Sequence, residues 1–486
     1  MNAELEIGAA AIDVTPRRPL FLYGYPHAPR ISTGVYDPLF SSAMYFAAGN
    51  TAVLFIANDV VLIPREMVRR VRERLSAVTM IPPCQILISA THTHSGPATC
   101  LYLADEVDTA IPPLDAEYLQ ELEAGMIAAG LAAYAARESA EVGVSVVSVE
   151  GLGTHRHDSA GPCESRVPVL VARSVKLKRP IGIMLVCAMH PTVLHEDSTL
   201  VSGDFPGLAR RYLQQKVVDK SCPVLHHTGP CGNLSPRHVL NGNTFGEAER
   251  LGCLLAGAVA GAIATMVFER PLNIRAGFTE IDLPRRQFPE VAEALLRVDS
   301  ARERLAALMQ RQNFSAAYFV GSALRTVSSQ SNKAVRSADP TRIAHDHLDA
   351  LAQRQAQRAE IRTAECDVFG AEATLTLARA RDAGRLKTAV DACLPAEIQI
   401  IGIGKWRWIA WPGELFVEFG LDITRHHPDT FVISLANGDL QGYLTTQQAV
   451  TENWYEAGSA VFESPESGRL IVAATNRLLE ELRGGR

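Results

Sequence analysis

Two short apolar runs on either side of an amphipathic segment constrain the fold of this chain most. Residues 51–63 (TAVLFIANDVVLI) and 84–90 (CQILISA) are rich in aliphatic side chains, and each predicts a buried strand. Residues 65–78 (REMVRRVRERLSAV) lie between them and mix apolar with charged positions, as an amphipathic helix does. Strand–helix–strand order at this spacing predicts an α/β layer.

Similar segments continue along the rest of the chain. Further strands are expected within residues 8–16, 142–154, 167–175, 181–191, 222–230, 396–414 and 431–444. Further helices are expected at residues 115–137, 246–266, 415–427 and 468–483. The sequence contains no internal repeat and no low-complexity linker, which favours one elaborate domain over several. We therefore expect an α/β fold in which residues 1–486 form a single large domain, with mixed β-sheets flanked by helices.

The composition changes within residues 286–390, which are rich in Ala, Arg, Gln and Glu. This pattern predicts helices, separated by a polar loop at residues 325–340 (RTVSSQSNKAVRSADP). The helices are interpreted as an insertion or cap within the domain. A pair of ordinary surface helices is the alternative.

The overall composition is that of a soluble globular protein. The net charge of −6, with 47% apolar and 21% charged residues, gives no support for nucleic-acid binding. The first residues, MNAELEIGAAAIDVTP, carry no basic segment followed by an apolar one, so no secretion signal is expected. No apolar run reaches the roughly 18 residues of a membrane span, so no stable membrane insertion is expected. The nine cysteines are scattered without a CxxC pair, which favours a reducing, cytoplasmic setting.

Two histidines follow the predicted strand at residues 84–90, in the segment ISATHTHSGP. In a strand, side chains two residues apart point to the same face, so His92 and His94 are expected to share a direction at the strand end. This arrangement is compatible with a metal site or with an acid/base pair. It is equally compatible with two polar residues that cap a strand.

Three other predicted strands end in residues that could perform chemistry. His190 ends the apolar run IGIMLVCAMHP, and ligand sites of α/β folds gather at the carboxyl ends of strands. Ser235 precedes a proline, which is typical of a helix N-cap but also presents a hydroxyl group. Glu414 in WPGE is expected where a strand turns into a helix. There its carboxylate is expected either to interact favourably with the helix dipole or, beside two histidines, to serve as a zinc ligand.

Tyr443 and Tyr455 lie in a polar, turn-rich segment, GYLTTQQAVTENWYEAGSA. They are interpreted either as packing residues with hydrogen-bonded hydroxyl groups or as a phenolic ligand and a transition-state donor.

Taken together and in order, these motifs resemble the neutral ceramidase family, the non-lysosomal zinc amidases. The motifs are THTHSGP, MHPT followed by SGDFPG, GNLSP, WPGE, and GYLTT followed by WYEAGSA. The segments AAIDVTP and THRHDSAGPCESRVPVL also fit the family pattern. The resemblance extends over nearly the whole chain outside residues 286–390.

The resemblance implies a mononuclear Zn²⁺ site in a single large catalytic domain. The positions that match the family's metal ligands are His92, His190, Glu414 and Tyr443. The positions that match active-site residues around the metal are His94, Ser235, Tyr455 and Arg156. The implied chemistry is amide hydrolysis, in which zinc lowers the pKa of a bound water toward about 7 and polarises the carbonyl. His94 and Tyr455 would stabilise the oxyanion or move the proton, and Ser235 would form a hydrogen bond or act as the nucleophile.

The chain also departs from the family pattern. It ends soon after YEAGSA, so the smaller β-domain of ceramidases is not expected, and it carries the additional helices of residues 286–390. No amphipathic helix with a basic face for membrane binding is evident. We therefore expect a small-molecule amide or ester as the substrate, with acylated compounds among the candidates. A zinc-dependent esterase or lactamase and a non-catalytic binding protein remain the alternatives.

Overall fold

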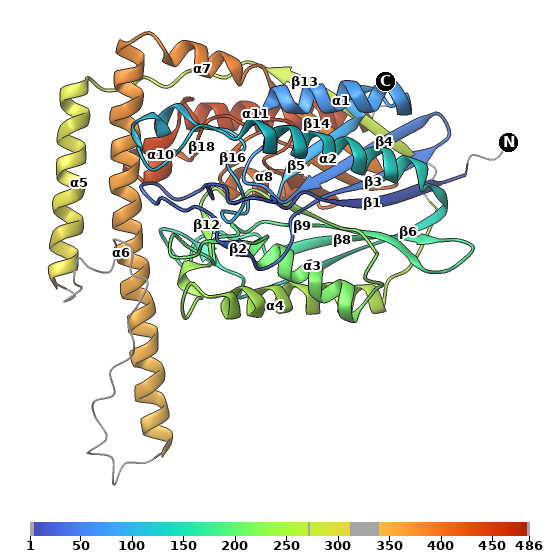
Figure 1. Ribbon diagram of the computed structural model, residues 1–486, viewed down its shortest axis with the longest axis horizontal. Helices are drawn as coiled ribbons and strands as arrows, with labels where there is room; N and C mark the ends of the chain where they lie inside the picture. The colour runs from blue at the N-terminus through green and yellow to red at the C-terminus, as the bar shows by residue number, and fades with distance from the viewer. Residues whose placement is uncertain (1–3, 271–272, 312–339, 484–486) are drawn as a thin grey trace.

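The computed structural model describes residues 4–270, 273–311 and 340–483 as a mixed α/β fold, with helices on the outer faces of several sheets (Figure 1). The expected fold class is therefore confirmed. Residues 325–339 of the expected polar loop lie outside the described residues.

An eight-stranded mixed sheet forms the centre of the molecule. In spatial order, its strands are β11 (Val224–Thr228), β9 (Pro180–Cys187), β8 (Arg166–Ser174), β6 (Glu138–Ser148), β1 (Glu6–Asp13), β3 (Phe40–Ala48), β4 (Thr51–Asn58) and β5 (Ile86–Ala90). β4 and β5 are parallel, as are β9 and β11, and the remaining neighbours are antiparallel. The predicted strand–helix–strand unit is β4, α1 (Arg65–Thr79) and β5.

The two halves of this sheet face each other. They are joined where β1 pairs with β6 over only two residue pairs. Gly182 of β9 lies so close to β3 that a methyl group there would be 2.7 Å from Met44. At the opposite edges, the Ser89 hydroxyl of β5 lies 2.7 Å from Nδ1 of His227 in β11. The carboxyl ends of β5, β9 and β11, distant in strand order, consequently lie near one another.

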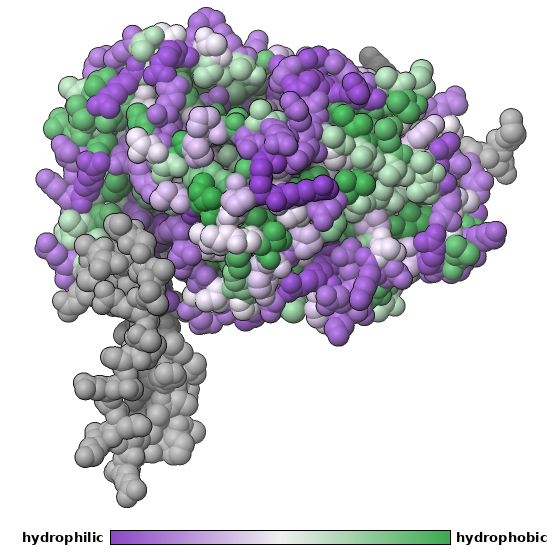
Figure 2. Space-filling model, in the orientation of Figure 1, coloured by the Kyte–Doolittle hydropathy of each residue, from purple (hydrophilic) through white to green (hydrophobic). Residues whose placement is uncertain are grey.

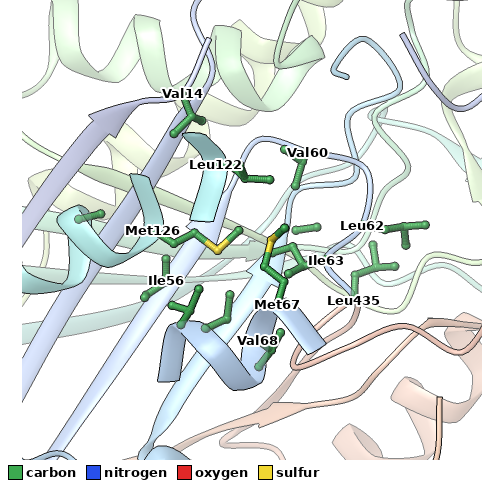
Figure 3. Close-up of a cluster of buried hydrophobic side chains, with 14 of the residues drawn as sticks. Val14, Ile56, Val60, Leu62, Ile63, Met67, Val68, Leu122, Met126 and Leu435 are labelled. Atoms are coloured by element: carbon green, nitrogen blue, oxygen red, sulfur yellow. The ribbon is translucent and has the colours of Figure 1, made fainter. Parts of the chain in front are cut away.

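Strand alternation divides the core into layers. Tyr45 of β3 belongs to the cluster beneath the helices, whereas the next residue, Phe46, packs between the sheets. Figure 3 shows Ile56, Met67 and Met126 of the cluster beneath the helices. The helices on the outer faces of the central sheet are α1, α2 (Ala116–Ala135), α3 (Asp204–Lys216) and α4 (Phe245–Ala264).

A second sheet closes the open side of this core. Its strands, in spatial order, are β13 (Ile274–Ile281), β14 (Ala396–Ile403), β15 (Trp406–Ala410) and β17 (Thr430–Ile433). Ile401 and Trp408 on one face pack against the central sheet, and Ile400 and Ile409 on the other face pack against α8 (Val417–His426) and α11 (Ser464–Arg483).

Short elements connect the longer strands and helices. They are β2 (Gly34–Val35), η1 (Pro83–Gln85), η2 (Leu103–Val107), β7 (Thr154–His155), β10 (Leu200–Val201), β12 (Leu234–Ser235), η3 (Pro236–His238), β16 (Glu414–Leu415), β18 (Tyr443–Leu444), α9 (Gln447–Thr451) and α10 (Tyr455–Ser459). Because such short pieces carry little apolar periodicity, the sequence does not reveal them.

The region of residues 286–390 is helical where it is described, as expected. It forms α5 (Val291–Arg311), α6 (Pro340–Asp382) and α7 (Leu386–Ala392), and α5 and α6 stand side by side along one flank (Figure 1). α6 packs against α10, η2 and η3. Among the described residues, no helix is long and apolar enough to cross a membrane. The face in Figure 2 carries polar and apolar side chains intermixed.

Candidate active site

The loops after β5 and β9 bring three histidines together. His92 and His94 follow β5, and His190 follows β9. The expectation that strand alternation directs the first two is wrong, because β5 ends at Ala90 and His92 has a left-handed φ of 68°. The two imidazoles nevertheless converge, since their Nε2 atoms are 3.3 Å apart. His190 Nε2 lies 2.9 Å from His92 Nε2.

Backbone carbonyl groups fix the tautomer of all three imidazoles. The contacts are His92 Nδ1 to the Val61 oxygen at 2.7 Å, His94 Nδ1 to the Gly24 oxygen at 2.9 Å, and His190 Nδ1 to the Cys231 oxygen at 2.8 Å. Because a carbonyl oxygen can only accept a hydrogen bond, each Nδ1 carries the proton and each neutral ring presents a lone pair at Nε2. Burial and the nearby Arg156 lower the pKa of His190 to about 3, so this ring is neutral at neutral pH.

Glu414 adds a carboxylate to these lone pairs. Its Oε2 atom lies 3.2 Å from Nε2 of both His92 and His190, and it has no hydrogen-bond donor. Buried acceptors that point at one another without a donor require a cation between them. The donor set of imidazole nitrogens and a carboxylate therefore fits a metal such as zinc.

Among the described residues, the group of side chains that could hold a metal ion consists of His92, His94 and His190, whose candidate ligand atoms lie within 4.8 Å of one another. His94, expected beside the metal, thus belongs to the same cluster as two expected ligands. The interpretation of Glu414 as a residue of a helix's first turn is wrong. It lies in β16, where it pairs in parallel register with Tyr443 of β18.

Two tyrosines lie side by side near the cluster. The hydroxyl groups of Tyr443 and Tyr455 are 2.5 Å apart, and Tyr455 is the first residue of α10. Burial, together with the negative charge of Glu414, raises the pKa of Tyr443 well above its usual value. Both phenols are therefore protonated at neutral pH and can donate hydrogen bonds.

Arg156 brings a buried positive charge to these tyrosines. Its guanidinium lies 5.8 Å from the ring of Tyr443 and 5.7 Å from that of Tyr455. Nη1 donates to Glu456 at 3.1 Å, and the other oxygen of this fully buried carboxylate lies 2.9 Å from Nε2 of His157. β7 pairs with β12 so that Thr154 lies opposite Ser235, and the Arg156 amide donates to the Asn233 carbonyl at 2.8 Å.

Ser235 has the capping role that its sequence suggests. It is the N-cap of η3, and its hydroxyl accepts a hydrogen bond from the Arg237 amide at 3.3 Å. The side chain also lines the cavity described next, so capping and a role at the site are compatible.

A cavity of about 190 Å³ opens beside the cluster. Seven of the eight residues expected from the sequence line it, and His190, which is fully buried, lies behind them. The lining residues among the eight are His92, His94, Arg156, Ser235, Glu414, Tyr443 and Tyr455.

Sequence reasoning missed several residues of the cavity wall. Polar and aromatic examples are Tyr25, His195, Arg237, Arg362, Cys366, Phe369 and Glu372. The last four belong to α6, so the helical region does form part of the wall. Their spacing on a helix rich in Ala, Arg and Gln is that of an ordinary solvated face, so nothing in the sequence distinguished them.

Comparisons with known proteins agree with this arrangement. Residues 5–228 match the family model described as neutral/alkaline non-lysosomal ceramidase, N-terminal. A neutral ceramidase of Oryza sativa subsp. japonica is 24% identical over 224 residues, which cover 43% of this chain and 28% of the relative. The match thus spans less than a third of that relative's length. The resemblance to neutral ceramidases expected from the sequence is confirmed.

Solved structures show the same fold over almost the whole chain. The crystal structure of the neutral ceramidase from Pseudomonas aeruginosa has a TM-score of 0.67 at 16% identity, covering 98% of this chain and 75% of that chain. A ceramidase complexed with C2 has a TM-score of 0.68 at 15% identity, with 98% and 76% coverage.

Proposed function

We propose that this chain is a zinc-dependent hydrolase that cleaves a linear amide bond in an N-acylated small molecule. The observation that carries the proposal is the group of buried acceptors at the cavity wall. Imidazole lone pairs and the Glu414 carboxylate point at one another there without a donor between them. The similarity to proteins named ceramidases supports amide hydrolysis as the reaction class.

The residues that would hold the ion are His92, His190 and Glu414, with Tyr443 as the fourth ligand expected from the family resemblance. Zinc in this position would act as a Lewis acid on the carbonyl and would make water a nucleophile near neutral pH. The carbonyl groups behind the three imidazoles hold each ring in the tautomer that presents Nε2 to the ion.

The other residues around the cavity have complementary tasks. Burial and the two other histidines lower the pKa of His94 well below its usual value, so this ring is a neutral base at physiological pH. Tyr455, protonated and hydrogen-bonded to Tyr443, can donate to the oxyanion that develops on the amide carbonyl. The charge of Arg156 stabilises the same developing negative charge. Ser235 can orient the substrate through its hydroxyl group.

Metal content provides the first test. Wild type should contain about one zinc per chain, and His92→Ala and Glu414→Ala should lose it. His426→Ala is the matched control, because its side chain is 65% exposed on α8, and it should retain the metal. No metal in wild type, or full content in both site variants, would refute the proposed centre and would favour a non-catalytic binding protein.

A substrate panel then tests the reaction class. Linear N-acyl amides, the corresponding O-acyl esters and lactams of similar size should be offered to zinc-loaded wild type. We expect the amides to be cleaved with the highest kcat/KM, and activity should be lost in Glu414→Ala. Preferential turnover of esters or lactams would assign one of the alternative activities to the same site.

A further inference from the structure

Arg237 is a cavity residue whose positive charge has no acidic partner in the described part of the chain. It is the second residue of η3, two positions after Ser235, and it lines the cavity. Nη1 donates to the Thr363 hydroxyl at 3.0 Å, and Nη2 donates to the Cys366 sulfur at 3.8 Å. Nε is buried and has no hydrogen-bond partner. Both contacts are neutral groups of α6, so they position the guanidinium without neutralising it.

The two other arginines of the wall differ in this respect. Arg156 is paired with the buried Glu456 at 3.1 Å. Arg362 is paired with Glu196 at 3.4 Å and with its helix neighbour Glu365. Arg237 adds a third guanidinium to the same region without adding a carboxylate.

The acidic residues of the wall are engaged elsewhere. Asp105 accepts from the Tyr23 hydroxyl and the Tyr102 amide, Asp108 accepts from the His27 amide, and Glu372 contacts His27 and Arg302. Among the described residues, none of them forms an ion pair with Arg237. Burial is the main cause that lowers the pKa of Arg237; the charges of Arg156 and Arg362 lower it further, whereas Cys366 and Glu456 act in the opposite direction.

A guanidinium held inside a cavity without a counterion is unfavourable unless a ligand supplies the negative charge. Arginine is suited to this task because its planar donors match the two oxygens of a carboxylate or phosphate. We propose that the substrate of this site carries an oxyanionic group, a carboxylate or a phosphate, that pairs with Arg237 beside the scissile amide. This inference rests on the proposed hydrolase function and narrows its substrate class. An uncharged N-acyl amino alcohol would leave Arg237 unpaired.

Three substrates of equal acyl length test the charge requirement. They are N-hexanoylglycine, N-hexanoylethanolamine and N-hexanoyl-O-phosphoethanolamine, which carry a carboxylate, a neutral hydroxyl and a phosphate. Zinc-loaded wild type should prefer at least one anionic substrate over the neutral one by about 10- to 100-fold in kcat/KM. The preferred anion identifies the source of the charge.

Arg237→Gln should remove this preference mainly through a higher KM for the anionic substrate, so that the ratio of kcat/KM between anionic and neutral substrates falls toward one. Arg237→Lys should restore part of the preference, because it keeps the charge but not the paired donors. Arg297→Gln, on the exposed side of α5, is the matched control and should behave as wild type. Equal turnover of charged and neutral amides by wild type, or an equal loss on both in Arg237→Gln, would overturn the proposal.

Anion binding provides a readout that does not require turnover. Inorganic phosphate, compared with chloride at constant ionic strength, should raise the Tm of zinc-loaded wild type and have no effect on zinc-loaded Arg237→Gln. Equal stabilisation of both proteins would place the anion elsewhere, and no stabilisation of wild type would also overturn the proposal. If no amide is hydrolysed, the proposed function fails and this measurement alone decides the role of Arg237.

Discussion

Replacing Glu456 by glutamine would test how the site keeps Arg156 charged and in place. Glu456 is completely buried at the start of α10, where its two oxygens contact Arg156 Nη1 at 3.1 Å and His157 Nε2 at 2.9 Å. Glutamine has nearly the same shape but no charge. The substitution therefore leaves the packing intact and removes the counterion of a buried guanidinium.

The size of the effect follows from the pKa of Glu456. Burial raises this pKa, but His157 and Arg156 outweigh burial and lower it from 4.5 to about 2. A difference of about 2.5 units, at about 1.36 kcal/mol each, corresponds to roughly 3 kcal/mol at neutral pH. This value agrees with the loss of about 3–5 kcal/mol that typically follows when one partner of a buried ion pair is removed. Because the folded-state pKa is the lower one, this stability is present above about pH 4.5 and is lost as the pH falls toward 2.

Urea denaturation of wild type and Glu456→Gln at several pH values measures the effect. We expect the free energy of unfolding of Glu456→Gln to be about 3 kcal/mol lower than that of wild type at pH 7. The difference between the two proteins should narrow between pH 5 and pH 3. Glu293→Gln, which removes an exposed ion pair with Arg297 on α5, should change stability by less than about 0.5 kcal/mol. A loss below about 1 kcal/mol at pH 7, or a gap independent of pH, would refute the reasoning.

Three further substitutions test other features. A methyl group at Gly370 would lie 2.7 Å from the Tyr455 backbone, so Gly370→Ala should separate α6 from α10 and lower the free energy of unfolding by about 1–3 kcal/mol, measured by urea denaturation. Gly257→Ala, where a methyl group meets nothing within 4 Å on α4, is the control and should be stabilising by about 0.5–1 kcal/mol. Burial raises the pKa of Asp367 to about 6, and its Oδ1 has no partner, so the carboxyl contributes stability below about pH 4 that is lost as the pH rises through 6. In urea denaturation, the free energy of unfolding of Asp367→Asn should therefore exceed that of wild type by about 1–3 kcal/mol at pH 8 and equal it at pH 4. Gly24 has a φ of +120°, and a methyl group there would lie 2.4 Å from a cluster imidazole, so Gly24→Ala should reduce amide hydrolysis at least tenfold while zinc content, assayed in parallel, changes little.

Local sequence patterns predicted the strands that precede the site, but not the path that joins them. The run at residues 181–191 correctly indicated β9 and a histidine near its end, because a buried strand needs only a short apolar stretch. The same argument failed in detail at His92. A residue with a left-handed φ, two positions beyond its strand, does not follow strand alternation. Glu414 was expected at a junction of strand and helix, but the two-residue strand that holds it is too short to produce a pattern of its own.

Contacts between distant segments were outside the reach of any local pattern. The meeting of His92 and His190 depends on the halves of the central sheet facing each other, which in turn depends on close packing at positions such as Gly182. Knowledge of the family motifs supplied this information indirectly. It supplied none for Arg237 and Arg362, because neither lies in a motif on which the resemblance was based.

The proposed metal-binding residues and the cavity wall therefore depend on different parts of the chain. His92, His190 and Glu414 are held by loops and a short strand at the edges of the two main sheets, and backbone carbonyl groups orient both imidazoles. The opposite wall is formed in part by α6, whose Thr363 and Cys366 also position the guanidinium of η3. Because no hydrogen bond of the histidine cluster within the described residues involves α6, side chains of this helix can vary without altering the proposed metal ligands. The proposed amide hydrolysis and a substrate range particular to this chain can thus coexist in one cavity.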